Sequence, residues 1–204
     1  MTSRTRVRRL PEKASTDEAV LHAILDQAVV AHIGIVDEGQ PFVLPVACAR
    51  DGDRLLVHGS TGSRLMRQMA QGSPVCATVT LLDGMVLARS AFNSSMHYRS
   101  AMILGVAQPV DDDLEALRVL TDHLLPGRWE ALREPTRKEL AATLVLALPL
   151  REWSVKISDS PPEDEPDDLD DPVWAGVVPL RMVQGDPVPA PDLRFDLPAP
   201  VTQA

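Results

Sequence analysis

The sequence predicts a mainly β protein, an antiparallel β-barrel decorated with a few helices. Six or more strand-like apolar runs follow one another through short segments with turn chemistry, and the helical patterns are few and lie at the ends of these runs. The chain has 204 residues and is 45% hydrophobic, but only 3% aromatic. The core is therefore expected to consist of Val, Leu, Ile, Ala and Met.

The first predicted element is a helix over residues 15–28. Ser15 and Glu18 have the spacing of a capping box, and apolar residues recur on one face of the following turns. The period then changes to that of strands in residues 29–37 and 41–50, which flank a turn at 37–40. A second hairpin is predicted at Asp51-Gly52, with its outgoing strand at 55–59.

The middle of the chain predicts a short helix and a longer hairpin. The helix begins near Leu65 and stops near Gly72. Residues 74–92 read as a long hairpin that turns at Asp83-Gly84, and residues 98–110 continue the sheet, with Gly105 expected to form a bulge.

The last ordered elements are two helices and two strands. Residues 111–125 form a helix, because acidic residues occupy its first turn and leucines share one face. Thr136 and Glu139 have capping-box spacing and start another short helix. Strands at 143–150 and 152–157 follow.

The two ends of the chain differ from the middle. Basic residues cluster at 4–9, and we expect residues 1–14 to be a flexible basic arm. Beyond residue 158 the chain is acidic and rich in proline, with ten of its eighteen prolines after residue 160. Residues 15–157 then form the barrel domain, and 158–204 an extension that docks on the barrel or on a partner subunit.

Composition also limits the function. The net charge of −9 and the pI near 5.0 argue against nucleic acid as a partner, since phosphate contacts need a basic face. No apolar stretch reaches membrane-spanning length, so no membrane association is expected. Two unpaired cysteines inside strand-like runs, Cys48 and Cys76, fit a reducing cytoplasm.

The stretch VHGSTGSRL, residues 57–65, is the first candidate binding site. It gathers hydroxyls, glycines and Arg64 where a strand gives way to a helix, which is the chemistry of a phosphate pocket. It matches neither the P-loop nor the dinucleotide pattern. A polar connection in which Ser63 caps the helix explains the same residues equally well.

The second candidate is the stretch SSMHYRSAM, residues 94–102. Alternation along a strand places Tyr98 and Ser100 on one face and Arg99 on the other. A buried polar group there needs a partner, and an interstrand salt bridge is the simpler explanation for Arg99. The five histidines show no metal-ligand spacing, so no metal site is predicted, and no Gly-x-Ser-x-Gly elbow supports a serine hydrolase.

In order along the chain, a Pro-Val strand, the His-Gly-Ser-x-Gly-Ser loop, the Tyr-Arg-Ser strand and a Trp-Ser-x-Lys strand resemble the pyridoxamine 5′-phosphate oxidase-like family of FMN-binding split barrels. The resemblance extends over residues 15–157, and its branch is that of flavin-nucleotide-binding proteins related to nitroimidazole reductases. It implies a six-stranded antiparallel split barrel that forms a homodimer with FMN at the interface.

The resemblance also implies which residues bind the cofactor. They are the backbone at Pro45, Val46 and Ala47 along the isoalloxazine edge; His58, Ser60, Thr61, Gly62, Ser63 and Arg64 around the phosphate; Tyr98, Arg99 and Ser100 beside the cofactor, supplied by either subunit; and Lys156 and Trp174, which complete or cover the pocket.

Before Tyr98 this chain reads Phe-Asn-Ser-Ser-Met-His, where the branch commonly has Phe-His-His-Ser-Met-Asn, so nitro-group reduction is not predicted. The vitamin-binding residues of true pyridoxamine phosphate oxidases are not recognisable either.

The predicted function is that of an FMN-dependent oxidoreductase that acts on an unidentified small molecule, with a nicotinamide nucleotide as reductant and His97 as the candidate proton donor. The alternative is a flavin- or haem-binding carrier or sensor without turnover. Haem would need His32, His58 or His97 as its ligand, and the deazaflavin F420 is a further alternative cofactor.

Overall fold

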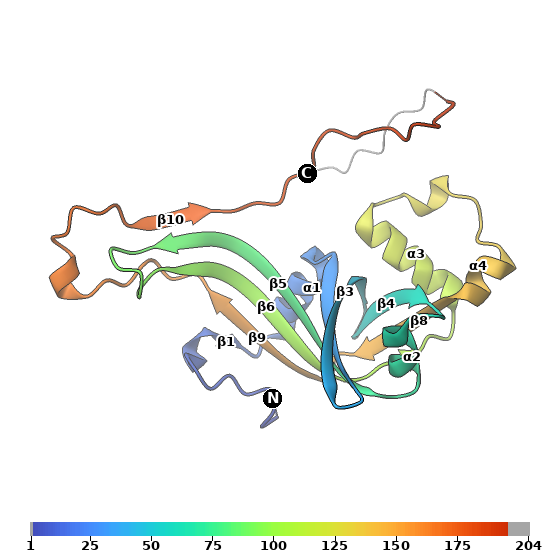
Figure 1. Ribbon diagram of the computed structural model, residues 1–204, viewed down its shortest axis with the longest axis horizontal. Helices are drawn as coiled ribbons and strands as arrows, with labels where there is room; N and C mark the ends of the chain where they lie inside the picture. Colours follow the sequence, from blue (N-terminus) through green and yellow to red (C-terminus); the bar gives the residue numbers. More distant parts are fainter. Residues whose placement is uncertain (1, 196–204) are drawn as a thin grey trace.

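The computed structural model describes residues 2–195, whose strands form one antiparallel sheet (Figure 1). The strands are β1 (Ala14–Ser15), β2 (Val30–Asp37), β3 (Gln40–Asp51), β4 (Arg54–Ser60), β5 (Pro74–Leu87), β6 (Ser95–Val106), β7 (Gln108–Pro109), β8 (Thr143–Pro149), β9 (Glu152–Ser158) and β10 (Gly176–Pro179). Their order is β1-β9-β6-β5-β2-β3-β4-β8-β7, with β10 pairing to β5. The curved sheet stays open between its end strands, β1 and β7, which confirms the predicted antiparallel split barrel.

Four α-helices and three 3-10 turns accompany the sheet in the described part of the chain. They are α1 (Glu18–Gln27), α2 (Arg64–Ala70), α3 (Asp113–Leu124), α4 (Arg137–Ala142), and the turns Pro11–Lys13, Trp129–Ala131 and Pro166–Asp168. None of these helices is long and apolar enough to cross a bilayer.

The main core fills the inside of the barrel. Apolar residues of α1 and α2, among them Leu21, Ile24 and Met66, pack there against the inward side chains of the strands. The large side chains that are fully buried are all Leu, Ile or Met, as the low aromatic content predicts. A second, smaller core lies on the outer face, where Ala116 and Leu120 of α3 cover Leu56 of β4.

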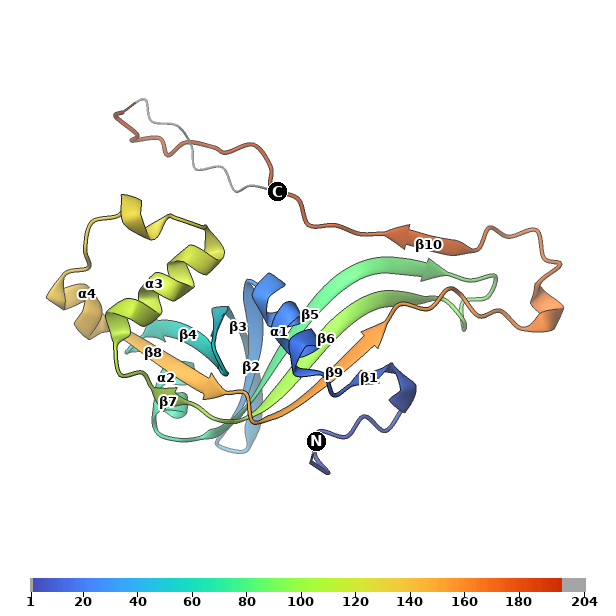
Figure 2. The ribbon, with the colours of Figure 1, turned by 180° about the vertical axis from the view of Figure 1, so that it is seen from behind.

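Strands β5, β6, β9 and β10 extend beyond the barrel as a long arm, on the side opposite α3 and α4 (Figures 1 and 2). The predicted hairpin turn at Asp83-Gly84 is wrong. Strand β5 runs through both residues with a bulge between Leu82 and Gly84, and its turn into β6 lies at residues 88–94. Gly84 serves a different purpose: a Cβ there would lie 3.1 Å from atoms of Val177 and Val178, so the glycine makes room for β10.

The expected bulge at Gly105 is also wrong, because Gly105 pairs with Val75 in an unbroken register. A Cβ at Gly105 would lie 3.0 Å from Leu148 Cδ1, so this glycine allows close packing across the barrel. Both glycines are needed for close approach of a neighbour, and neither ends a strand.

The start of the first helix also differs from the prediction. The N-cap is Asp17, whose carboxylate accepts from the backbone N–H of Ala19, while Ser15 accepts from the N–H of Asp17. Aspartate is as good a cap as serine, so the local sequence offered two starts. The capping box of Thr136 and Glu139 is confirmed.

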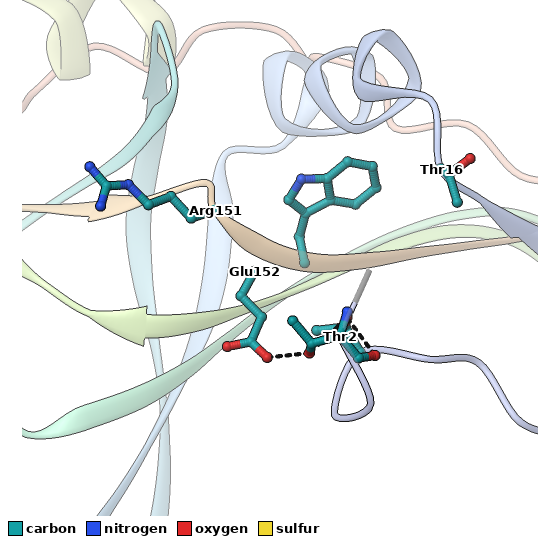
Figure 3. A pocket seen from close by; sticks show the side chains of 6 residues that line it. Thr2, Thr16, Arg151 and Glu152 are labelled. Carbon is teal, nitrogen blue, oxygen red and sulfur yellow. Dashed lines mark hydrogen bonds between the residues drawn. The ribbon is translucent and has the colours of Figure 1, made fainter.

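The N-terminal segment, residues 1–14, which the sequence predicts to be a flexible basic arm, lies along β9 where it is described. Arg4 pairs with Glu152, Thr2 donates to the same carboxylate (Figure 3), and β1 pairs with β9. The small cavity beneath this contact holds about 100 Å³, which is room for water but far below a cofactor's needs.

The C-terminal extension contacts the long arm of β5 and β6 at two points. Asp164, whose side chain is 2% exposed, accepts from the backbone N–H and the guanidinium of Arg89, and β10 pairs with β5. Residues 196–204 of the predicted C-terminal extension and residue 1 of the predicted N-terminal basic arm lie outside the described residues.

Candidate functional site

The first group of predicted site residues lies on β3, β4 and the loop that follows β4. Cys48 pairs with Val57, so Ala47 and His58 are the next residues along two neighbouring strands. His58 pairs on its other side with Val145 of β8. Its side chain points to the outer face of the barrel, on the same side of the strand as Leu56, beyond the patch that α3 covers.

His58 carries an unsatisfied polar atom. Its Nδ1 is buried and has no hydrogen-bond partner among the described residues. Burial lowers the pKa of the imidazole, so the ring is neutral at neutral pH. A neutral imidazole is the form that ligates a metal, and buried polar groups rarely stay without a partner.

The loop at residues 60–63 uses most of its hydrogen-bond donors within the chain. The N–H of Thr61 donates to Ala142 O (3.0 Å), and that of Ser63 to Ser60 O (2.9 Å). The N–H of Gly62 donates to Ser60 Oγ (3.1 Å), and Ser63 Oγ caps α2 by accepting from Met66 (3.4 Å). The connecting and capping role is therefore present, and the side chains of Thr61 and Arg64 remain for an anion.

Arg64 is held at the edge of the barrel by two contacts. Its guanidinium carbon lies 3.8 Å from the centroid of the Phe42 ring, and Nη1 lies 3.7 Å from a carboxylate oxygen of Asp37. About half of the side chain stays exposed. The cation is thus oriented by stacking and remains accessible to a phosphate. Neither Phe42 nor Asp37 could be recognised from spacing, because both precede Arg64 by more than twenty residues.

The second group lies on β6 and β9. Ser100 pairs with Lys156, and its hydroxyl donates to Lys156 O (3.3 Å). The Lys156 ammonium donates to Arg9 O (3.2 Å), so it is turned toward the N-terminal segment. Arg99 donates to both carboxylate oxygens of Asp83 on β5, and the interstrand salt bridge considered for Arg99 is confirmed.

Two other candidates lie apart from both groups. His97 Nε2 is 2.8 Å from Ser160 O, and the ring thereby joins the arm to the C-terminal extension. Trp174 is 64% exposed and lies over Gly176, where a Cβ would be 2.9 Å from the indole. Within one chain, Trp174 covers the distal part of the arm.

The two groups do not meet in one chain. Strands β2 and β5 separate β3 from β6, so these two strands stand three strand spacings apart, about 14 Å along the sheet. The outer face of β2 and β3 carries exposed valines among the described residues: Val30 is 43% exposed, Val36 64% and Val43 63%.

A groove of about 810 Å³ opens beside Arg99. The end of α1 with Gln27, the end of α3 with His123, strand β5 and residues 180–184 line it. Its volume is in the range of cofactor sites. Sequence reasoning missed Gln27 and His123, because only the fold brings the ends of these helices next to β6.

These features define the class of antiparallel split barrels, with candidate site residues divided between two parts of the sheet. The chain belongs to the pyridoxamine 5′-phosphate oxidase family, whose family model matches residues 17–157. This confirms the resemblance seen in the sequence.

Two solved structures are similar over almost the whole chain. The FAD and haem binding protein of Mycobacterium smegmatis is 45% identical with a TM-score of 0.88, and the match covers 92% of this chain and 94% of that protein. The flavocytochrome Anf3 of Azotobacter vinelandii is 42% identical with a TM-score of 0.90, and the match covers 98% and 94%.

A candidate 5-nitroimidazole antibiotic resistance protein of Bacteroides thetaiotaomicron shares the fold, at 22% identity and a TM-score of 0.57 over 71% of this chain and 86% of that one. No curated protein is significantly similar to the chain.

Proposed function

We propose that the protein is a redox protein that binds a flavin and a haem, with His58 as the haem ligand. The observation that carries the haem assignment is the buried His58 Nδ1 on the outer face of β4, which has no hydrogen-bond partner within residues 2–195 and belongs to an imidazole whose pKa is lowered by burial. The two relatives that match more than nine-tenths of the chain are an FAD and haem binding protein and a flavocytochrome, which supports both cofactors.

His58 suits this role better than the other two histidines considered. His97 already has a partner in the Ser160 carbonyl, 2.8 Å away. His32 is exposed on β2, and neither of its ring nitrogens is a buried atom that lacks a hydrogen-bond partner. His58 is half-buried between β3 and β8, so its ring can present one nitrogen to iron while packing restricts its orientation.

Arg64 is the residue that we assign to the flavin phosphate. Stacking on Phe42 fixes the guanidinium, and the neighbouring Thr61 hydroxyl has no hydrogen bond to another described residue. The relatives favour FAD over the FMN expected from the sequence. A flavin supplies hydride and single-electron chemistry when bound, while the protein contributes position and exclusion of water.

We further propose that two copies of the chain form the cofactor site. The uncovered apolar face around Val36 and Val43 and the separation of the two residue groups support a homodimer. In such a dimer, Tyr98 of one subunit and Arg64 of the other face the same ligand. The protein acts as an oxidoreductase on a small molecule if a nicotinamide nucleotide reduces the bound flavin.

An absorption spectrum of the purified full-length protein tests the cofactor proposal. We expect flavin bands and a Soret band, and mass spectrometry of the released flavin distinguishes FAD from FMN and F420. H58A should lose the Soret band and keep the flavin, whereas the control variant H32A should keep both. A Soret band that survives in H58A would refute the haem assignment. Anaerobic addition of NADH or NADPH then distinguishes an enzyme, whose bound flavin the nucleotide reduces, from a carrier, whose flavin stays oxidised.

A further inference from the structure

The fold brings together three metal-ligating side chains that are far apart in the sequence. Glu18 and His22 stand one turn apart on α1, and Asp53 comes from the turn between β3 and β4. One ligand atom of each lies within 4.8 Å of the other two. The histidine spacings alone predict no metal site, because Asp53 joins the cluster only through the tertiary structure.

The imidazole of His22 is the central member of the cluster. Its Nε2 is buried and has no hydrogen-bond partner among the described residues, and it lies 3.8 Å from a carboxylate oxygen of Glu18. Bonds of about 2.1 Å to a tetrahedral zinc ion separate two ligand atoms by roughly 3.4 Å. A small rotation of the Glu18 side chain is therefore enough for both atoms to reach one ion.

The Glu18 and Asp53 carboxylates are available as metal ligands. Within residues 2–195, neither the Glu18 nor the Asp53 side chain accepts a hydrogen bond, and the imidazole is the one ion-pair partner of Glu18. The other acids nearby are engaged: Asp26 is held by Arg50 and Asp51 by Arg54, at 2.7 and 2.6 Å.

The cluster lies beside room for water ligands, and it carries the charge of two carboxylates. Glu18 and Asp53 line an open cavity of about 580 Å³. Arg54 and Arg151 also line it, but Arg54 is paired with Asp51. The Glu18 and Asp53 carboxylates carry two negative charges, which a divalent cation would offset.

We propose that Glu18, His22 and Asp53 bind a divalent transition-metal ion, with water completing its coordination. One nitrogen and two carboxylate oxygens suit zinc, whereas calcium and magnesium prefer oxygen alone. The ion would tie the start of α1 to the β3–β4 turn. Because Leu21 and Ile24 of α1 fill the barrel core, this tie would stabilise the whole fold.

Titration calorimetry of the full-length protein with zinc chloride tests the proposal. We expect one zinc ion per chain and a thermal unfolding midpoint that rises with zinc concentration. H22Q and D53N should each weaken zinc binding by roughly tenfold or more, since removing even an outer-shell partner typically costs that much. H32Q, which removes an exposed imidazole elsewhere, should bind zinc as the unaltered chain does.

D53N changes an exposed turn and leaves the helix intact, so it remains informative if H22Q folds poorly. Absence of zinc binding in the unaltered chain would overturn the proposal. Equal zinc affinity in D53N, H22Q and H32Q would overturn it as well, because the ion would then sit elsewhere. None of these results depends on flavin or haem.

Discussion

Arg99 on β6 holds Asp83 on β5 through two parallel hydrogen bonds, each 2.8 Å long, at the point where β5 bulges. This pair links β5 to β6 at the base of the arm. Gln27 at the end of α1 accepts a third hydrogen bond from the same guanidinium, at 3.0 Å. Asp83, which the sequence pattern assigns to a turn, therefore links two neighbouring strands.

Asp83→Asn should lower the free energy of unfolding by about 1 kcal/mol, the upper end for pairs that solvent screens. The hydrogen bonds from Arg99 lower the pKa of Asp83 below its ordinary value of 3.8. A lowered pKa stabilises the fold above pH 3.8, and this contribution disappears as the pH falls through the lower value. The free energies of unfolding of the two proteins, measured with denaturant, should thus differ at pH 7 and converge as the pH falls below 3.8. D111N, which changes an exposed acid without a contact in the described chain, should not reproduce this pattern.

Arg64→Ala should weaken flavin binding by roughly 1.5–3 kcal/mol, the scale of a hydrogen bond to a charged group. Fluorescence titration of the flavin-free protein measures the affinity. Arg67→Ala is the matched control, because Arg67 is exposed on the same helix and its side chain makes no hydrogen bond or ion pair with another described residue. Equal affinity of the two variants would argue against a phosphate contact for Arg64.

Gly84→Val should release β10 from β5. The added carbons would meet Val177 and the carbonyl of Val178, which a Cβ already approaches to 3.1 Å. Trypsin should then cut faster after Arg181, just beyond β10, while the barrel's melting temperature changes little. Gly185→Ala, where a Cβ meets open space, should leave the cleavage rate unchanged.

The two cysteines should differ in reactivity. Burial raises the pKa of Cys48 to about 11, and Cys76 is shifted in the same direction but is only half-buried. At pH 8 roughly one Cys48 thiol in a thousand is ionised, and the thiolate is the reactive form. A disulfide exchange assay on the native protein should label Cys76 first and Cys48 only on unfolding. Rapid labelling of Cys48 would mean that the barrel opens readily.

Ending the chain after Ser158 should leave the barrel folded, because both core clusters lie before that residue. The loss of Asp164 and β10 should loosen the arm. Sedimentation equilibrium then shows whether the extension holds the proposed dimer: a truncated dimer assigns the interface to the barrel face, and a monomer assigns it to the extension. A chain ending after Gln184 keeps β10 and serves as the control.

The strands, most of their turns and the composition of the core could be read from the sequence. Each depends on neighbours close in the chain: the period of apolar residues, the caps at Ser63 and Thr136, and the turns at 37–40 and 51–52. The wrong predictions at Ser15, Gly84 and Gly105 share one cause. The local sequence was compatible with two structures at each position: either of two caps at the start of α1, and a turn or bulge or a continuous strand at each glycine. At both glycines, packing against a neighbouring element determines which structure forms.

For the candidate site, the sequence by itself determined which residue types are present: the hydroxyl-rich loop, Arg64, His58 and the Tyr-Arg-Ser strand. Only the tertiary structure decided which of them are engaged. In the tertiary structure the loop's donors bond within the chain, Arg99 pairs with Asp83, and His58 Nδ1 has no partner among residues 2–195. The tertiary structure also gathers Glu18, His22 and Asp53. A side chain's reactivity depends on burial and on neighbours within a few ångströms, and those neighbours come from strands and helices that the sequence keeps far apart.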